Sequence, residues 1–178
     1  GGSSGGSSGG SSGGSSGGVS SLNAIFDSQG GSSISRVSTT TGGVIATNPG
    51  TPTRAGYTFI GWFKSSSGGT AINFPFTHNQ TEDFTLYAQW LAKTLTITFD
   101  SQGGSNISNS STASGGVIAT NPGTPTRPGY SFLGWSITPN GSDVIIFPYM
   151  HNQTDSFTLF ARWASTAWGC SSRWPRAS

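Results

Sequence analysis

The sequence is poor in charge, in cysteine and in long apolar runs, and each shortage excludes a class of protein. Charged residues make up 8% of the 178 residues, whereas about 25% is usual in a globular domain. The net charge of +2 leaves too few cations for a run of phosphate contacts, which excludes nucleic acid as a partner. The single cysteine, Cys170, excludes a disulfide framework within the chain and a cysteine-rich zinc site. No apolar run approaches the roughly 20 residues of a membrane-spanning helix.

Serine, threonine, glycine and asparagine take the place of the missing charged and apolar residues. Apolar residues are 32% of the chain, below the usual value of about 45–50%. Aromatic residues are nevertheless 12%, with six tryptophans, and disordered chains are poor in aromatic residues. The composition therefore predicts a folded protein, and its low charge favours an extracellular one.

An internal repeat dominates the sequence. The segment at residues 42–54 recurs unchanged at 115–127, and shorter matches before and after it keep the same offset of 73. Residues 22–90 and 95–163, compared at this offset, are identical at 43 of 69 positions. The chain therefore contains two copies of one structural unit, typical of a repeat protein.

Four segments follow from the repeat. A Gly/Ser linker or arm occupies residues 1–18, the first repeat unit 19–91, the second unit 92–164 and a C-terminal tail 165–178. Gly/Ser sequence usually forms a flexible linker; the alternative is an arm that adds a strand to a neighbouring sheet edge. The very short connection between the two units is expected to limit bending between them.

Apolar alternation predicts the strands. In residues 94–99 three apolar side chains alternate with threonine, the pattern of a half-buried strand. Residues 56–62 and 84–90 predict two more strands in the first unit, with a bulge or a close backbone contact at Gly61. Residues 70–82 are compatible with a short strand or a turn of helix. No segment has sustained helical periodicity, so each unit is predicted to have three or four strands and at most one short helix.

The core of so small a unit must be dense in large side chains. Four tryptophans, Trp62, Trp90, Trp135 and Trp163, lie in predicted strands with apolar neighbours. We expect them to pack in the core, although exposed tryptophans would instead suit stacking on sugar rings. The aromatic residues expected to form the first core are Phe26, Phe59, Trp62, Phe74, Phe84 and Trp90.

These motifs, in this order, closely resemble the Listeria–Bacteroides repeat family. The matching stretches are 26–31, 42–49, 52–62 and 84–90 in the first unit, and 99–104, 115–122, 125–135 and 157–163 in the second. The resemblance implies a small β-grasp-like (ubiquitin-like) fold in each unit. It also implies a tandem module of a bacterial surface protein, active in adhesion and host contact rather than as an enzyme. The stretch between Trp62 and Phe84 departs from the family pattern, as does Phe160, which replaces the usual tyrosine.

The two histidines, His78 and His151, are weak candidates for catalysis or metal binding. A general base needs a nucleophile and an orienting carboxylate nearby. Asp83 follows His78, but Ser156 stands at the matching place in the second unit. Two separate histidines also cannot form the usual clustered metal site. We therefore expect both to be structural turn residues.

Two further repeated residues have structural and functional interpretations. Asp27 and Asp100 each offer one carboxylate, whereas calcium requires six or more oxygen ligands, so a role in a turn is favoured. Arg54 and Arg127 could bind an acidic partner. Each precedes a tyrosine by three residues, and we expect the arginine to cover an aromatic ring.

The sequence therefore predicts a mainly β or α+β protein of two tandem β-grasp-like repeats with no catalytic, cofactor-binding or metal-binding residues. Its predicted function is that of a non-enzymatic module at the bacterial cell surface, acting in adhesion, display or stalk formation. The expected partner is a surface protein or glycan of another cell. One alternative is a self-assembling fibre or pilus-like subunit joined by strand addition between edges. A second alternative is a carbohydrate-binding module.

Overall fold

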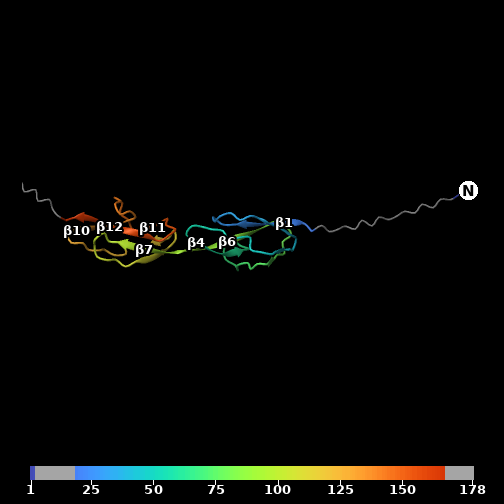
Figure 1. Cartoon of the computed structure of the whole chain (residues 1–178), viewed down its shortest axis with the longest axis horizontal. Helices are drawn as coiled ribbons and strands as arrows, with labels where there is room; N and C mark the ends of the chain where they lie inside the picture. The colour runs from blue at the N-terminus through green and yellow to red at the C-terminus, as the bar shows by residue number, and fades with distance from the viewer. Residues whose placement is uncertain (3–18, 167–178) are drawn as a thin grey trace, which may run out of the picture.

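The computed structural model describes residues 1–2 and 19–166, and these residues contain strands and connections but no helix. Two units of strands lie end to end along the long axis of the molecule (Figure 1). The first unit contains β1 (Ser21–Asp27), β2 (Val37–Thr40), β3 (Val44–Ile45), β4 (Tyr57–Phe63), β5 (Phe76–Thr77) and β6 (Phe84–Ala92). The second contains β7 (Thr94–Asp100), β8 (Ser110–Ala113), β9 (Val117–Ile118), β10 (Tyr130–Ser136), β11 (Tyr149–Met150) and β12 (Phe157–Ser165).

Each unit is built on a four-stranded sheet and a small two-stranded sheet. The larger sheets have the orders β2-β1-β6-β4 and β10-β12-β7-β8, and the smaller ones pair β3 with β5 and β9 with β11. The first and last strands of each unit are parallel neighbours in the middle of the sheet, with antiparallel strands outside them. This confirms the mainly β class and agrees with the β-grasp-like arrangement implied by the resemblance.

The predicted strands form for the expected reason. In β7, Leu95, Ile97 and Phe99 are buried and the residues between them are exposed, as period-2 alternation requires. In β4 the pairing with β6 shifts register between Phe59 and Gly61, and Gly61 has a φ of 141°. The predicted bulge is therefore confirmed, and glycine suits it because a side chain rarely adopts this conformation.

The predicted number of strands is wrong, because each unit has six strands rather than three or four. Of the two alternatives for residues 70–82, the short strand is confirmed: β5 forms at Phe76–Thr77, and no helical turn forms there. The edge strands β2 and β8 were missed because their sequences, Val-Ser-Thr-Thr and Ser-Ser-Thr-Ala, are mostly polar and show no apolar alternation. Edge strands face solvent on more sides than central strands, so they need less apolar surface.

The core of each unit surrounds one fully buried tryptophan. Trp62 is 1% exposed and Trp135 is 0% exposed. The Trp62 ring packs edge-on against Phe26 and Phe59, with centroids 4.9 and 5.5 Å apart. The predicted aromatic residues all belong to this first cluster, but only Phe26 and Trp62 are fully buried. Small and aliphatic side chains that the prediction omitted complete its centre: Ala24, Ile45, Leu86 and Ala88.

One residue, Lys93, connects the two sheets. Its backbone N–H donates to the carbonyl of Gly56 in the first unit at 2.9 Å, and its carbonyl accepts from the N–H of Ser114 in the second at 2.8 Å. A β-carbon on Gly56 would collide with Oγ of Ser114 and would lie 3.2 Å from Cβ of Thr154. The units therefore touch directly at this junction, and the limit on bending between them stays a prediction.

Candidate functional site

The repeated aspartates act in turns. The N–H of Gln29 donates to Oδ1 of Asp27 at 2.9 Å, and Gln102 donates to Asp100 at 2.8 Å. Both glutamines have a φ of 46°, a left-handed conformation that such a side-chain bond helps to hold. Among the described residues, no group of three histidine, cysteine, aspartate or glutamate side chains is close enough to bind a metal ion.

The repeated arginines cover tyrosine rings. The guanidinium carbon of Arg54 lies 4.0 Å from the ring centroid of Tyr57, and Arg127 lies at the same distance from Tyr130. This confirms the structural interpretation of both arginines. Stacking at a partly exposed site contributes about 0.5–1 kcal/mol.

The two histidines are buried structural residues. His78 accepts a hydrogen bond at Nδ1 from the N–H of Gln80, so its Nε2–H donates to Oγ1 of Thr39 at 3.0 Å. His151 makes the same two contacts with Gln153 and Thr112. Burial lowers the pKa of His151. Neither ring is placed to act on a molecule from solvent, because both ring nitrogens already have partners within the chain.

The four tryptophans of the repeat units divide into two classes. Trp62 and Trp135 are buried, and their indole N–H groups donate to Gly50 and Gly123. Trp90 and Trp163 are half-buried at the sheet surface, and they donate to Ser28 and Ser101. The prediction of core packing is therefore confirmed, because the first pair lies in the core and the second pair packs against it. Any stacking on a sugar ring would fall to the second pair.

A polar hollow of about 340 Å³ lies beside Trp90 in the first unit. Its amide side chains are already occupied. Nε2 of Gln29 donates to the carbonyl of Ser66 at 3.0 Å, and Nε2 of Gln89 donates to that of Gly68 at 2.7 Å. These bonds hold the loop after β4 and engage the amide N–H groups of both glutamines within the chain.

Asp83 and Ser156 occupy matching positions in the two units, and they have the same structural role although their side chains differ. Oδ1 of Asp83 accepts the N–H of Asn23 at 2.7 Å, and Oγ of Ser156 accepts that of Thr96 at 2.9 Å. The two hydrogen bonds from Asn23, aided by the positive charge of Arg36, hold the pKa of Asp83 below its usual value. Both side chains therefore stabilise the first strand of their unit.

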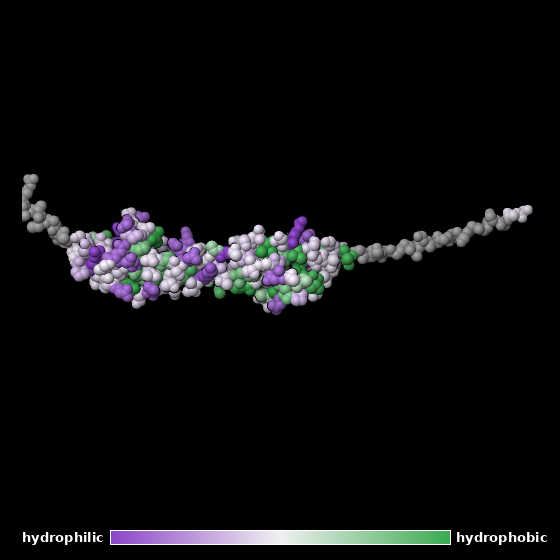
Figure 2. All heavy atoms as spheres, in the orientation of Figure 1, coloured by the Kyte–Doolittle hydropathy of each residue, from purple (hydrophilic) through white to green (hydrophobic). Residues whose placement is uncertain are grey.

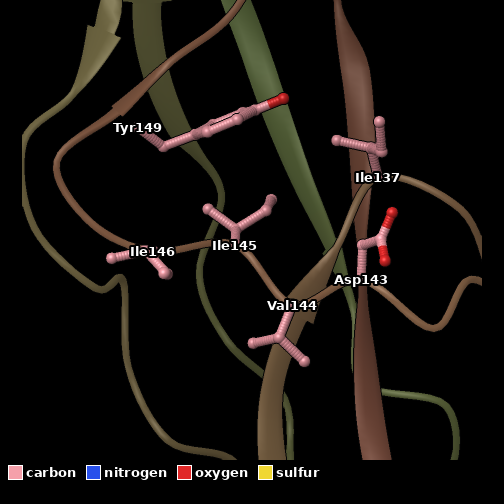
Figure 3. A pocket seen from close by; sticks show the side chains of 6 residues that line it. All are labelled: Ile137, Asp143, Val144, Ile145, Ile146 and Tyr149. Carbon is pink, nitrogen blue, oxygen red and sulfur yellow. The ribbon is translucent and has the colours of Figure 1, made fainter.

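The clearest difference between the surfaces of the two units is an apolar hollow in the second. It has a volume of about 330 Å³, and its lining comes from the loop after β10 and from β11. Figure 3 shows the ring of Tyr149 across the hollow from Ile137 and Asp143. The residues lining the hollow are Ile137, Asp143, Val144, Ile145, Ile146 and Tyr149.

The sequence analysis assigned no role to these residues, although a comparison of the two repeats shows that apolar residues replace polar ones here. At the offset of 73, Ile137 matches Lys64 and Ile146 matches Asn73. Both isoleucines are exposed, Ile146 to 84%. On the face drawn in Figure 2, apolar residues occur in groups on both units, between polar ones.

Comparison with known proteins shows the family of the chain. The family model described as the Listeria-Bacteroides repeat domain matches residues 23–89 and again 96–162, well over half of the chain. The chain belongs to the Listeria-Bacteroides repeat family. The resemblance expected from the sequence motifs is therefore confirmed, in two tandem copies.

Three longer proteins have related sequences. Internalin H of Listeria monocytogenes is 34% identical over 114 residues, which are 64% of this chain and 20% of that protein. Two predicted membrane proteins of Evansella cellulosilytica, one of them Gly-rich, are also 34% identical. These matches cover 78% of this chain and 20% or 16% of the relatives. The chain thus spans about a fifth of each relative or less.

The residues shared by the two Listeria-Bacteroides repeats hold the fold, and the differing loops form its distinctive surface. No helix in the described part of the chain is long and apolar enough to span a membrane. The Gly/Ser arm at residues 3–18 and the segment 167–178, which includes Cys170, lie outside the described residues, so the predictions made for them are not tested.

Proposed function

We propose that this chain is a non-enzymatic module of a bacterial cell-surface protein, which extends outward and presents its loops to another cell. The observation that carries the proposal is the stacked arrangement of two family repeats joined through Lys93. A direct contact between units favours an extended rod, as in other repeat proteins. The names of the relatives, an internalin and two predicted membrane proteins, support a location at the cell surface.

Absence of enzyme activity is part of the same proposal. The histidines and several other polar residues shared by the two units are engaged in turns, loop contacts or ring packing. An active site needs a nucleophile, a base and an orienting group within mutual reach. No such constellation was found among the described residues.

Antibody labelling of cells that encode the chain would test its location. Labelling of intact cells as strong as that of permeabilised cells is the expected result. Labelling that requires permeabilisation would contradict the proposal. The purified chain, added as a competitor, is further expected to reduce the attachment of those cells to host cells, whereas an equal amount of serum albumin is not.

Self-assembly through strand addition is the second candidate. The observation that favours it is that the four-stranded sheets end in the edge strands β4 and β10, which carry the exposed Ile60 and Leu133. Unpaired edges promote association. Light scattering distinguishes the assembly subunit from the surface module. Fibres or high masses would favour the assembly subunit, and a monomeric mass would exclude self-assembly.

A further inference from the structure

Two apolar side chains of the hollow in the second unit, Ile137 and Ile146, are not required by the fold. The first unit has the same strand order and register, yet it carries Lys64 and Asn73 where the second carries Ile137 and Ile146. Both isoleucines remain exposed, to 49% and 84%. Exposed apolar groups gathered at one hollow mark an interaction site more often than isolated ones do. A binding role would explain residues that folding does not.

Comparison with the first unit shows that the hollow lacks a positively charged group. There, Nζ of Lys64 lies 5.5 Å from the ring centroid of Phe76. The matching ring in the second unit is Tyr149, and the isoleucine that replaces the lysine supplies no cation. The second unit thus has the aromatic ring of this pair without its positive charge.

A carboxylate has also been added at the same place. Asp143 lines the hollow, where the first unit has Thr70. Its one hydrogen-bond donor within the described chain is Oγ of Ser142, at 3.2 Å, and no cationic group of the described residues lies within ion-pairing distance. A half-buried aromatic ring that lines a hollow and an unpaired carboxylate both attract a cation.

We propose that this hollow binds a partner protein through a short segment that combines a basic side chain with an apolar one. The lysine or arginine of that segment lies over Tyr149 and pairs with Asp143. The neighbouring aliphatic or aromatic side chain packs against Val144 and Ile146. The inference rests on the proposed surface function and deepens it, because it names a contact surface and the chemistry of its partner.

The dimensions of the hollow suit such a segment. A volume of about 330 Å³ is at the small end of the roughly 300–1,000 Å³ found for ligand sites. It holds one or two side chains rather than a helix or a folded domain. A single anchor of this kind gives weak binding, which becomes useful when many copies act together on a cell surface.

The test uses three acetylated, amidated pentapeptides: Gly-Lys-Leu-Lys-Gly, Gly-Glu-Leu-Glu-Gly and Gly-Lys-Gly-Lys-Gly. Each is titrated into the full chain, labelled with ¹⁵N, while the amide signals of residues 137–150 are followed. Residues 64–77 of the first unit serve as the internal reference. We expect the Lys-Leu-Lys peptide to shift the signals of 137–150 selectively, with affinity about fivefold higher than that of either other peptide.

Exchange between the two units provides matched variants. Ile137→Lys with Ile146→Asn gives the second unit side chains that the first unit carries on the same backbone, and it is expected to abolish binding. Asp143→Thr is expected to weaken binding by about three- to fivefold. The converse set, Lys64→Ile, Thr70→Asp and Asn73→Ile, is expected to create a second site in the first unit. The ¹⁵N spectrum of each variant reports whether it remains folded.

Three results would overturn the proposal: no shifts, equal shifts in both units, or equal binding of the lysine and glutamate peptides. The same titration is repeated with a variant that lacks residues 167–178. If the peptide binds only to this variant, the proposal that the partner is another protein would also be overturned. This result would make that segment, with its two tryptophans and two arginines, the competing occupant. Failure of the peptide test together with labelling of intact cells would reject this inference and leave the proposed surface function standing.

Discussion

At the residue scale, identical positions in the two units provide matched measurements within one chain. Oγ of Ser28 and Oγ of Ser101 are buried and have no hydrogen-bond partner among the described residues. The neighbouring Ser32 and Ser105 accept the N–H groups of Thr53 and Thr126 at 2.9 Å. Serines a few residues apart therefore differ in whether their hydroxyl contributes to stability.

We expect Ser28→Ala to raise the free energy of unfolding by about 1 kcal/mol, because it removes a buried hydroxyl that makes no hydrogen bond. Ser32→Ala is the control, and it should lower the same free energy by about 0.5–1 kcal/mol because it removes an acceptor in use. Denaturant unfolding, followed by residue-resolved NMR, gives both values. Equal destabilisation by the two substitutions would contradict the assignment.

The buried His151 predicts a stability that depends on pH. Burial lowers the pKa of His151 below its ordinary value of 6.5, so the unfolded chain takes up a proton at a pH where the folded chain does not. The stabilising contribution of the neutral ring is therefore complete above about pH 6.5 and is lost as the pH falls below it. Melting temperatures of the second unit measured across this range are expected to fall with pH. His151→Gln should melt at a lower temperature with a shallower dependence on pH, and an unchanged slope would contradict the role of this ring.

At the scale of single elements, strand formation depends on contacts that sequence alternation does not reveal. The strands β1 and β7 alternate buried and exposed residues and were predicted. Each also needs a side-chain acceptor for one backbone N–H, supplied from far along the chain by Asp83 or Ser156. Sequence reasoning weighed Asp83 only as a catalytic partner of His78, because the pairing with β1 requires the folded sheet.

Replacement of the acceptor tests this role. Asp83→Ala is expected to lower the melting temperature of the first unit, and Asp83→Ser to lower it less, because serine performs the same task in the second unit. Ser156→Ala should cost about 1 kcal/mol. Since the pKa of Asp83 is lowered by its hydrogen bonds to Asn23, its contribution is present above the ordinary aspartate pKa of 3.8. It is lost as the pH falls through the lower folded value, and Asp83→Ala should lack this acid-dependent loss.

At the scale of the whole molecule, the junction determines the direction in which the second unit points. Lys93 and Thr166 make the same hydrogen bond at the ends of their units. The backbone N–H of each donates to the carbonyl of a glycine at 2.9 Å, and the two glycines occupy matching positions. These glycines, Gly56 and Gly129, have nearly equal φ angles of 76° and 77°. Their surroundings differ, because Gly56 faces Ser114 and Gly129 has nothing within 4 Å of a built β-carbon.

This pair separates backbone strain from contact between the units. Gly56→Ala and Gly129→Ala should each cost about 1–2 kcal/mol of unfolding free energy, because both place a side chain at positive φ. Only Gly56→Ala is expected to change the angle between the units, since its new β-carbon collides with Ser114. Residual dipolar couplings of the two units measure that angle. A change of equal size in Gly129→Ala would show that the contact does not set the orientation.

The sequence by itself determined the repeat, its period, the β class, the central strands, the bulge at Gly61 and the family. These follow from local patterns, since alternation and turn chemistry act between residues that are close along the chain. Only the tertiary structure decided the polar edge strands, the aliphatic centre of the core, the contact at Gly56 and the apolar hollow beside Tyr149. Each of these depends on which side chains far apart in sequence become neighbours, and a period-2 pattern carries no information about such distances.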